Sequence, residues 1–232
     1  MRNNKVKIDQ LFNEYPHNRP IIFTCLEGQY SCELIEDEDY VILFTPFDYH
    51  YVAGKVPSDE ELFLTHITEY IKNHQVDEFV LFGPNMEWER FLEVVFQKIH
   101  GVIDARYLYR LDEEKYQADE QFHDCIIEEI DDDLSNKPLL QATIKKGNEK
   151  VSFATALMVG DHQAEIDVYT KDPFRRMGLA YKVSKKLIDE LLRRKLVPNW
   201  CCWRIKASSQ QLAKKLGFVF EREIKAFVWV KD

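Results

Sequence analysis

The apolar positions in the first half of the chain alternate between short runs and helical spacings. Short runs bounded by turn residues predict strands at 21–25, 40–44, 49–53, 79–82 and 106–111. Between them, Ser58 and Glu61 form a capping-box pair that opens one helix, and a second helix over 86–99 ends at Gly101. This alternation predicts a small α/β domain over residues 1–115.

The second half continues the alternation with longer elements. Strands are expected at 125–127, 151–158, 164–170, 198–203, 218–222 and 225–230. A short helical stretch is expected between the first two strands, and longer helices over 174–195 and 208–216. Strands interleaved with helices predict the α/β (α+β) class, with a second domain over 116–232.

A faint similarity links the two halves. Strand 79–82 and helix 86–99 resemble strand 199–203 and helix 208–216 in order and spacing. Such βα pairs also look alike by chance, so both a true internal repeat and a coincidence stay open. If the repeat is real, the first half is a decayed copy of the second.

Charge is distributed unevenly along the 232 residues. The net charge is −9, yet residues 171–232 alone carry +10 and the remaining residues −19. This acidity argues against a nucleic-acid partner, and no apolar run approaches the ~18 residues of a membrane helix. A basic segment in an acidic chain favours a small phosphorylated anion, with two solvated helix faces as the ordinary alternative.

Cysteines and histidines give weaker indications. The five cysteines are an odd number and include no Cys-x-x-Cys pair, which favours a reduced protein and a cytoplasmic location. The seven histidines never adopt a metal-ligand spacing such as His-Glu-x-x-His, so no metal is expected.

The most informative segment is strand 164–170 and the helix that follows it. Arg175 and Arg176 place two cations at the positive end of the helix dipole, which is unfavourable unless an anion binds there. Gly178 and Ala180 keep the surface small, so the N–H groups of the helix start are accessible to a phosphate. An ordinary surface turn with two solvated arginines is the alternative.

These residues resemble a known motif. Arg175-x-x-Gly178-x-Ala180, placed after an acidic strand, is similar to the acyl-CoA-binding motif of the GNAT superfamily of N-acetyltransferases. Residues 212–218 resemble the late helix and following strand of that superfamily. With Glu165-Ile166-Asp167 and Pro198-Asn199-Trp200, the resemblance covers about residues 120–232 and is strongest to the zwittermicin-A-resistance-like branch.

The resemblance implies a mixed sheet whose two central parallel strands, 164–170 and 198–203, splay apart around acetyl-CoA. Backbone groups of Val168, Tyr169 and Thr170 would then bond the pantetheine arm. The pyrophosphate would lie on the amides of the helix start, beside the two arginines. The residues expected there are Arg175, Arg176, Met177, Gly178, Leu179 and Ala180.

Transfer of an acetyl group to an amine needs a base, and two carboxylates are candidates. Glu165 is the first choice and Asp167 the second, since they lie two apart on one strand face; solvated strand carboxylates are the alternative. A backbone N–H near Val168 or Tyr169 would stabilise the tetrahedral intermediate.

The sequence departs from the superfamily at the group that protonates the leaving thiolate. Many members carry a tyrosine in the late helix at the position of Ala213, and Tyr181, Ser209 and water are the remaining candidates. The expected function is an acyl-CoA-dependent N-acetyltransferase that acts on a small, cationic amine. The alternative is a non-catalytic CoA-binding regulatory or scaffolding module, and a homodimer is left open.

Overall fold

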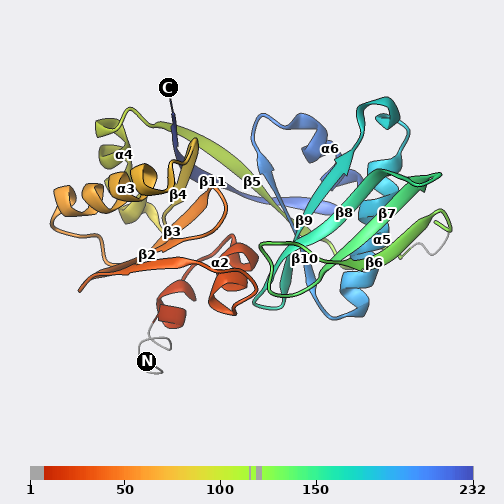
Figure 1. Ribbon diagram of the computed structural model, residues 1–232, viewed down its shortest axis with the longest axis horizontal. Helices are drawn as coiled ribbons and strands as arrows, with labels where there is room; N and C mark the ends of the chain where they lie inside the picture. The colour runs from red at the N-terminus through yellow and green to blue at the C-terminus, as the bar shows by residue number, and fades with distance from the viewer. Residues whose placement is uncertain (1–7, 115, 119–121, 232) are drawn as a thin grey trace. The chain divides into compact units, whose positions relative to one another are not determined.

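Figure 1 shows the computed structural model, which describes residues 8–114, 116–118 and 122–231. Two compact units are present. The first contains the described residues of 1–18, 31–106 and 224–232, and the second those of 19–30 and 107–223. Both ends of the chain therefore contribute to the first unit. Lys115, at the expected domain boundary, lies outside the description, and that boundary stays a prediction.

The first unit is a mixed sheet that shares its core with helices α3 and α4. Its strands follow the order β1-β2-β3-β4-β11, in which only β3 and β4 pair in parallel among the registers described. Large aromatic side chains, among them Phe63, Phe79 and Trp88, fill its core. The elements are β1 (Glu33–Glu36), β2 (Tyr40–Phe44), β3 (Tyr49–Gly54), α3 (Glu60–His74), β4 (Glu78–Phe82), α4 (Met86–Lys98) and the last part of β11 (Phe218–Val230).

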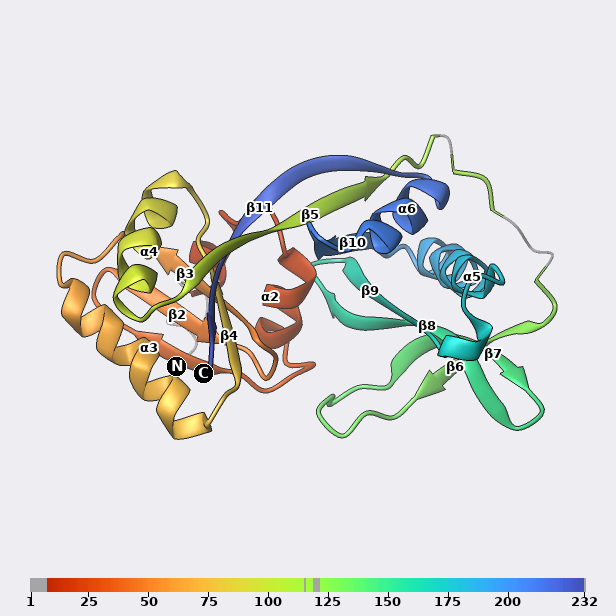
Figure 2. The same ribbon diagram turned by 90° about the horizontal axis from the view of Figure 1, so that it is seen from above.

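The second unit is also a mixed sheet, with the strand order β5-β10-β9-β8-β7-β6. Helices α5 and α6 lie side by side on it (Figure 2). Its elements are α2 (Arg19–Leu26), β6 (Cys125–Ile130), β7 (Leu139–Lys146), β8 (Glu149–Gly160), β9 (Gln163–Thr170), the 3₁₀ turn η1 (Asp172–Phe174), α5 (Leu179–Arg193), β10 (Val197–Trp203) and α6 (Ala207–Lys215). Strands β5 (Val102–Leu111) and β11 contribute residues to both units.

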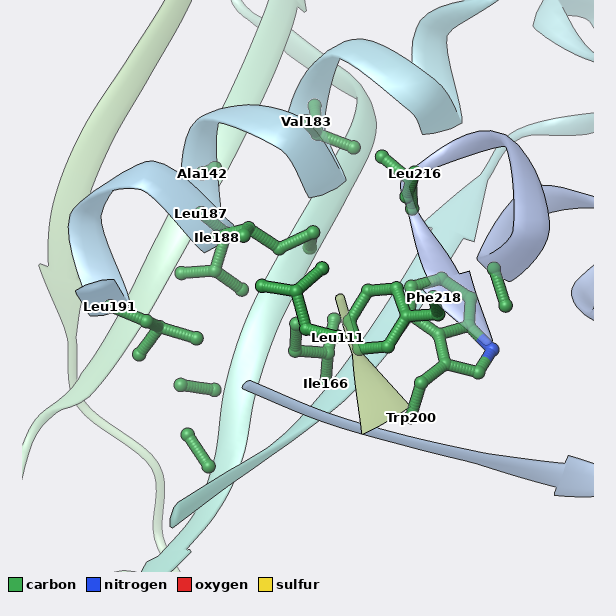
Figure 3. Packing of buried hydrophobic residues seen from close by; sticks show 14 of the residues in the cluster. Leu111, Ala142, Ile166, Val183, Leu187, Ile188, Leu191, Trp200, Leu216 and Phe218 are labelled. Carbon is green, nitrogen blue, oxygen red and sulfur yellow. The ribbon is translucent and has the colours of Figure 1, made fainter. Parts of the chain in front are cut away.

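Helix α5 carries the apolar stripe that the sequence predicts. Leu187, Ile188 and Leu191 are fully buried and point toward the strands (Figure 3). Trp200 and Phe218 complete the same core, with their ring centroids 5.6 Å apart. Because this face of α5 is packed along its length, the first turn of the helix is held firmly beyond the end of β9.

The two central parallel strands of the second unit separate along their length. Strands β9 and β10 share three pairs, the last of which joins Glu165 to Asn199. Beyond that pair β9 continues to Thr170 and β10 to Trp203 without pairing to each other. The predicted splay of 164–170 and 198–203 is confirmed, and it begins after Glu165.

The order of elements repeats between the two halves of the chain. The series β1-β2-β3-α3-β4-α4-β5 recurs as β7-β8-β9-α5-β10-α6-β11, with a parallel pair of strands at the same place in each. The last strands are exchanged, because β11 lies beside β4 and β5 beside β10. The faint sequence similarity links β4–α4 to β10–α6, which are matching members of this series.

The strand expected at 21–25 is wrong. These residues lie in helix α2, in which Pro20 and every following residue are buried. A short apolar run that is buried on all sides has no polar face, so its periodicity does not distinguish a strand from a helix.

Three further expectations in the second unit are corrected. Strand β7 occupies the place of the short helical stretch expected after 125–127. The strands expected at 218–222 and 225–230 form the single strand β11. Helix α5 begins at Leu179, because Asp172–Phe174 form a separate 3₁₀ turn before it.

A side chain from segment 19–30 completes an irregular part of this sheet. Leu157 is an extra residue in β8, opposite the step from Glu165 to Ile166 in β9. The buried Gln29 amide replaces the missing strand partner. Its Nε2 donates to the Leu157 carbonyl at 3.2 Å, and its Oε1 accepts from the Val159 N–H at 3.2 Å.

We therefore expect Gln29→Leu to lower the free energy of unfolding by about 1–3 kcal/mol, because it removes the acceptor of the Val159 N–H and leaves the Leu157 carbonyl with the Tyr30 hydroxyl at 2.7 Å. Chemical denaturation monitored by circular dichroism measures the loss. The same change at the exposed Gln97 is the matched control and should cost no more than about 0.5 kcal/mol. Equal losses for the two variants would show that Gln29 does not support the bulge.

Candidate active site

A cleft of about 790 Å³ opens where β9 and β10 separate. Its walls are the outer end of β9, the loop into α5, the first turn of α5, the start of the unpaired part of β10 and one face of α6. The lining residues that the sequence singled out as site candidates are Asp167, Val168, Tyr169, Thr170, Arg175, Arg176, Gly178, Leu179 and Ala180.

Two predicted site residues lie elsewhere. Met177 is not among the lining residues, and its side chain is 59% exposed on the loop before α5. Glu165 is also absent from the lining and is only 8% exposed, at the last pair between β9 and β10. The cleft thus brings one of the two candidate carboxylates, Asp167, to its surface.

Helix α5 begins without a side-chain cap. Its N-cap, Gly178, has a φ of 76° and offers no side-chain acceptor, and Arg176 also adopts a left-handed φ of 61°. Because the first N–H groups of a helix have no partner within it, they remain available to a ligand and carry the positive end of the dipole. Glycine suits this position because L residues are strained at that φ.

Cations surround this helix start. Arg175 is anchored by Asp172, with Nη2 to Oδ1 at 2.8 Å, and by the Thr170 carbonyl at 3.2 Å. Arg176 and Lys215 line the cleft as well, the latter with its Nζ 4.8 Å from the Tyr181 ring centre. The positive segment found in the sequence is therefore concentrated on a concave surface that suits an extended polyanion.

Asp167 differs from an ordinary surface carboxylate. Its side chain is exposed to the cleft, yet the surrounding protein partly desolvates the charged form and raises the pKa of this carboxyl. The backbone N–H of Val168 lowers the pKa to a smaller degree. Asp167 is thus closer than a free aspartate to the pKa that suits a base at neutral pH.

The face of α6 that borders the cleft was missed by the sequence analysis apart from Ser209. Ser208, Ser209, Leu212 and Lys215 line the cleft, and their i, i+1, i+4, i+7 spacing places them on one side of the helix. That spacing could have identified them. Ala213, at the expected tyrosine position, is fully buried in the core and is not among the lining residues.

The matching helix start in the first unit has the opposite chemistry. Helix α3 is capped by Asp59, whose carboxylate accepts from the Leu62 N–H at 2.9 Å, rather than by Ser58 as the sequence suggested. Glu60 and Glu61 add two negative charges to its first turn. The cap already bonds a free N–H of the helix start, and the negative charges compensate the helix dipole and repel a phosphate.

In the first unit, a tyrosine side chain lies between the ends of the two parallel strands. The buried Tyr15 hydroxyl lies within 2.7 Å of the carbonyl oxygens of both Val52 and Phe82, which belong to β3 and β4. It also accepts from the Val52 N–H at 3.2 Å. A side chain therefore fills the position at which the corresponding strands of the second unit separate.

The described residues show no metal cluster, no disulfide and no membrane-spanning helix. Among residues 8–114, 116–118 and 122–231, no group of three or more His, Cys, Asp or Glu side chains is placed to hold a metal ion. All five cysteines are free thiols. None of the helices in the described part of the chain has the length and apolar character to cross a membrane.

Comparison with known sequences finds a family model and a curated relative that match parts of the chain. Residues 142–227 match the family model described as GNAT acetyltransferase. YdfB of Bacillus subtilis (strain 168), an uncharacterised N-acetyltransferase, is 34% identical over 125 residues, which are 53% of this chain and 48% of that protein. The chain thus spans about half the length of this curated relative.

Comparison with solved structures gives the fold. A GCN5-related N-acetyltransferase-like protein from Streptococcus suis 89/1591 has a TM-score of 0.70 at 21% identity, over 99% of both chains. A tandem GNAT protein from the clavulanic acid biosynthesis pathway has a TM-score of 0.58 at 10% identity, over 93% of this chain and 88% of that one. The predicted mixed α/β fold is confirmed.

We expect Gly178→Glu to weaken acetyl-CoA binding by at least about tenfold, or ~1.4 kcal/mol, because it places a carboxylate at the helix start. Isothermal titration calorimetry measures the affinity. Gly147→Glu is the matched control, since Gly147 also has a positive φ and open space around it but lies in the turn between β7 and β8. Equal affinities in the two variants would place the phosphates elsewhere.

Proposed function

We propose that the protein is an acyl-CoA-dependent N-acetyltransferase acting on a small, cationic amine, and the match of residues 142–227 to the GNAT acetyltransferase model supports this proposal. One observation carries the proposal. The uncapped, basic start of α5 lies on a cleft that opens between two separating parallel strands.

The residues of the cleft fit acyl-CoA. The free N–H groups after Gly178, together with Arg175 and Arg176, suit the pyrophosphate. The backbone of β9 from Val168 to Thr170 has lost its partner on the β10 side and can bond the amides of the pantetheine arm. When bound, acetyl-CoA supplies a thioester whose carbonyl carbon is attacked by the acceptor amine.

Within this proposal Asp167 removes the proton of the amine, directly or through a water molecule. Its carboxylate borders the cleft, and its raised pKa makes it a stronger base than an ordinary aspartate. Glu165 stays the other candidate. Because its side chain is buried, a proton from the cleft would reach it only through other groups. A backbone N–H at Val168 or Tyr169 would stabilise the oxyanion of the tetrahedral intermediate.

The proposal also covers the first half of the chain, as a degenerate GNAT-like copy that binds no acyl-CoA. The repeated order of elements supports a common origin of the halves. The acidic, capped start of α3 and the Tyr15 hydroxyl between β3 and β4 support the loss of the site. The excess of acidic residues outside 171–232 would steer a cationic acceptor toward the protein.

Other expectations stay proposals of the same kind. They are membership of the zwittermicin-A-resistance-like branch, a cytoplasmic location and a homodimer. A non-catalytic CoA-binding module is the alternative function, and it is favoured by one observation: the expected tyrosine position is occupied by the buried Ala213.

Thiol release separates the enzyme from the binding module. The protein should release free CoA from acetyl-CoA only when a suitable amine is present, and a thiol reagent follows this release across polyamines, aminoglycosides and amino acids. Tight acetyl-CoA binding without release for any amine, also in a second panel of arylamines and peptides, would favour the non-catalytic module.

Asp167→Asn should keep acetyl-CoA binding and lower kcat/KM by about 10²–10⁴-fold near neutral pH. The loss should shrink as pH rises, because more of the acceptor amine is then already neutral. In the wild type the rate should fall as pH drops through the raised pKa of Asp167, since the base becomes protonated. Glu165→Gln is the parallel variant. If it alone carries the pH-dependent loss, Glu165 is the base instead.

A further inference from the structure

We infer that the Ser209 hydroxyl, oriented by Trp200, donates a hydrogen bond to the sulfur of the leaving CoA thiolate. This inference rests on the proposed function and completes it, because Ala213 provides no donor at the position where one is expected. Ser209 is already a lining residue of the cleft. Three features of its surroundings support the assignment.

The first feature is its place in the cleft. Trp200 directly follows Asn199, the last residue of β10 that pairs with β9, so it lies where the two strands begin to separate. Its indole Nε1–H donates to Ser209 Oγ at 3.1 Å. This hydrogen bond holds Ser209 near the point where β9 and β10 begin to separate. Asp167 borders the same cleft from β9.

The second feature is the direction of the hydroxyl proton. A serine oxygen offers one proton and two acceptor sites, and the Trp200 N–H occupies one of the latter. Within the described residues, the Ser209 hydroxyl makes no hydrogen bond as a donor. Figure 3 shows the indole nitrogen at the edge of the packed apolar cluster, on the side away from α5. The Ser209 proton is therefore available to an acceptor in the cleft.

The third feature is the local charge. Ser209 is the third residue of α6, so the positive end of that helix dipole adds to its action on an anion. Lys206 and Lys215 line the same cleft. A thiolate formed beside Ser209 would thus be stabilised by a directed O–H and by the helix dipole, in a cleft that also carries lysines.

The chemical step balances with these groups. As the bond from carbon to the amine nitrogen forms, the bond from carbon to sulfur breaks and its electron pair stays on sulfur. The amine proton goes to the base, for which Asp167 is proposed. Because a thiol has a pKa of about 8.5, far below that of an alcohol, Ser209 keeps its proton and only donates a hydrogen bond. Solvent protonates the thiolate afterwards.

Tyr181, the other side chain considered for this role, lies beside the predicted phosphate site. It belongs to the first turn of α5, where Lys215 lies over its ring and Phe122 packs edge-on at 6.3 Å. That turn adjoins the predicted phosphate site, whereas the splay begins at Trp200.

The test compares CoA with desulfo-CoA, which lacks the sulfur, so it needs no knowledge of the acceptor amine. If Ser209 stabilises the thiolate, the pKa of the bound thiol lies below the free value. The ratio of CoA affinity to desulfo-CoA affinity then rises as pH increases toward about 8.5 and levels off above it. We expect a rise of about tenfold for the wild type, measured by calorimetry between about pH 6.5 and about pH 9.5.

Ser209→Ala should flatten this rise and lower kcat by about 10- to 100-fold with little change in KM for acetyl-CoA. Gln211→Ala, on the same helix but exposed and outside the cleft lining, is the control and should keep both. Trp200→Phe removes the indole N–H together with part of a buried ring, so its stability is measured as well. If its effect on kcat acts through Ser209, that effect and the effect of Ser209→Ala will not add.

The outcomes separate the two proposals. An equal rise in the wild type and in Ser209→Ala would overturn the role of Ser209, as would no rise in the wild type. Recovery of the rise in Ser209→Thr but not in Ser209→Ala would support the hydroxyl itself. If the wild type binds neither CoA nor desulfo-CoA, the proposed function fails, and the role of Ser209 with it.

Discussion

The hydrogen bonding between β9 and β10 stops after Glu165 and Asn199, and the cleft exists because of this interruption. Neighbouring parallel strands normally satisfy each other's peptide groups, and unpaired groups away from water are costly. Two structural supports keep the strands apart here. The Gln29 amide completes the bulge in β8 at the level where the separation begins, and the packed stripe of α5 holds its helix start beyond β9. A ligand with amides and phosphates can then supply hydrogen-bond partners for the backbone groups that the two strands leave unpaired.

The two halves of the chain show how little separates a binding site from its closed counterpart. Both contain a parallel pair of strands followed by a helix, in the same order of elements. In the second half the helix starts at Gly178 among arginines. In the first half Asp59 caps the helix, and the Tyr15 hydroxyl bonds both strands. Under the proposed function, a cap, the sign of the local charge and one hydroxyl would distinguish the half that binds a phosphate from the half that does not.

The sequence predicted the parts of this site whose signals are local. The Arg175-x-x-Gly178-x-Ala180 motif lies on one short loop and helix turn, and the structure places it on the cleft. It did not reveal that 21–25 are helical, because a fully buried run has no polar face to show its period. The two candidate bases share a strand face, yet only Asp167 borders the cleft, because the strands separate after Glu165. The link from Trp200 to Ser209 joins a strand to the next helix, so it depends on tertiary packing.

Hydrogen exchange with and without acetyl-CoA tests the central claim most directly, because it reads each backbone amide that the account assigns to the ligand. We predict slower exchange on binding in residues 168–170 and 177–181, where β9 has lost its partner and α5 begins. Residues 59–63, at the capped start of α3, should be unchanged. Protection at 59–63, or none at 177–181 under saturating acetyl-CoA, would contradict the assignment of the site to the second unit.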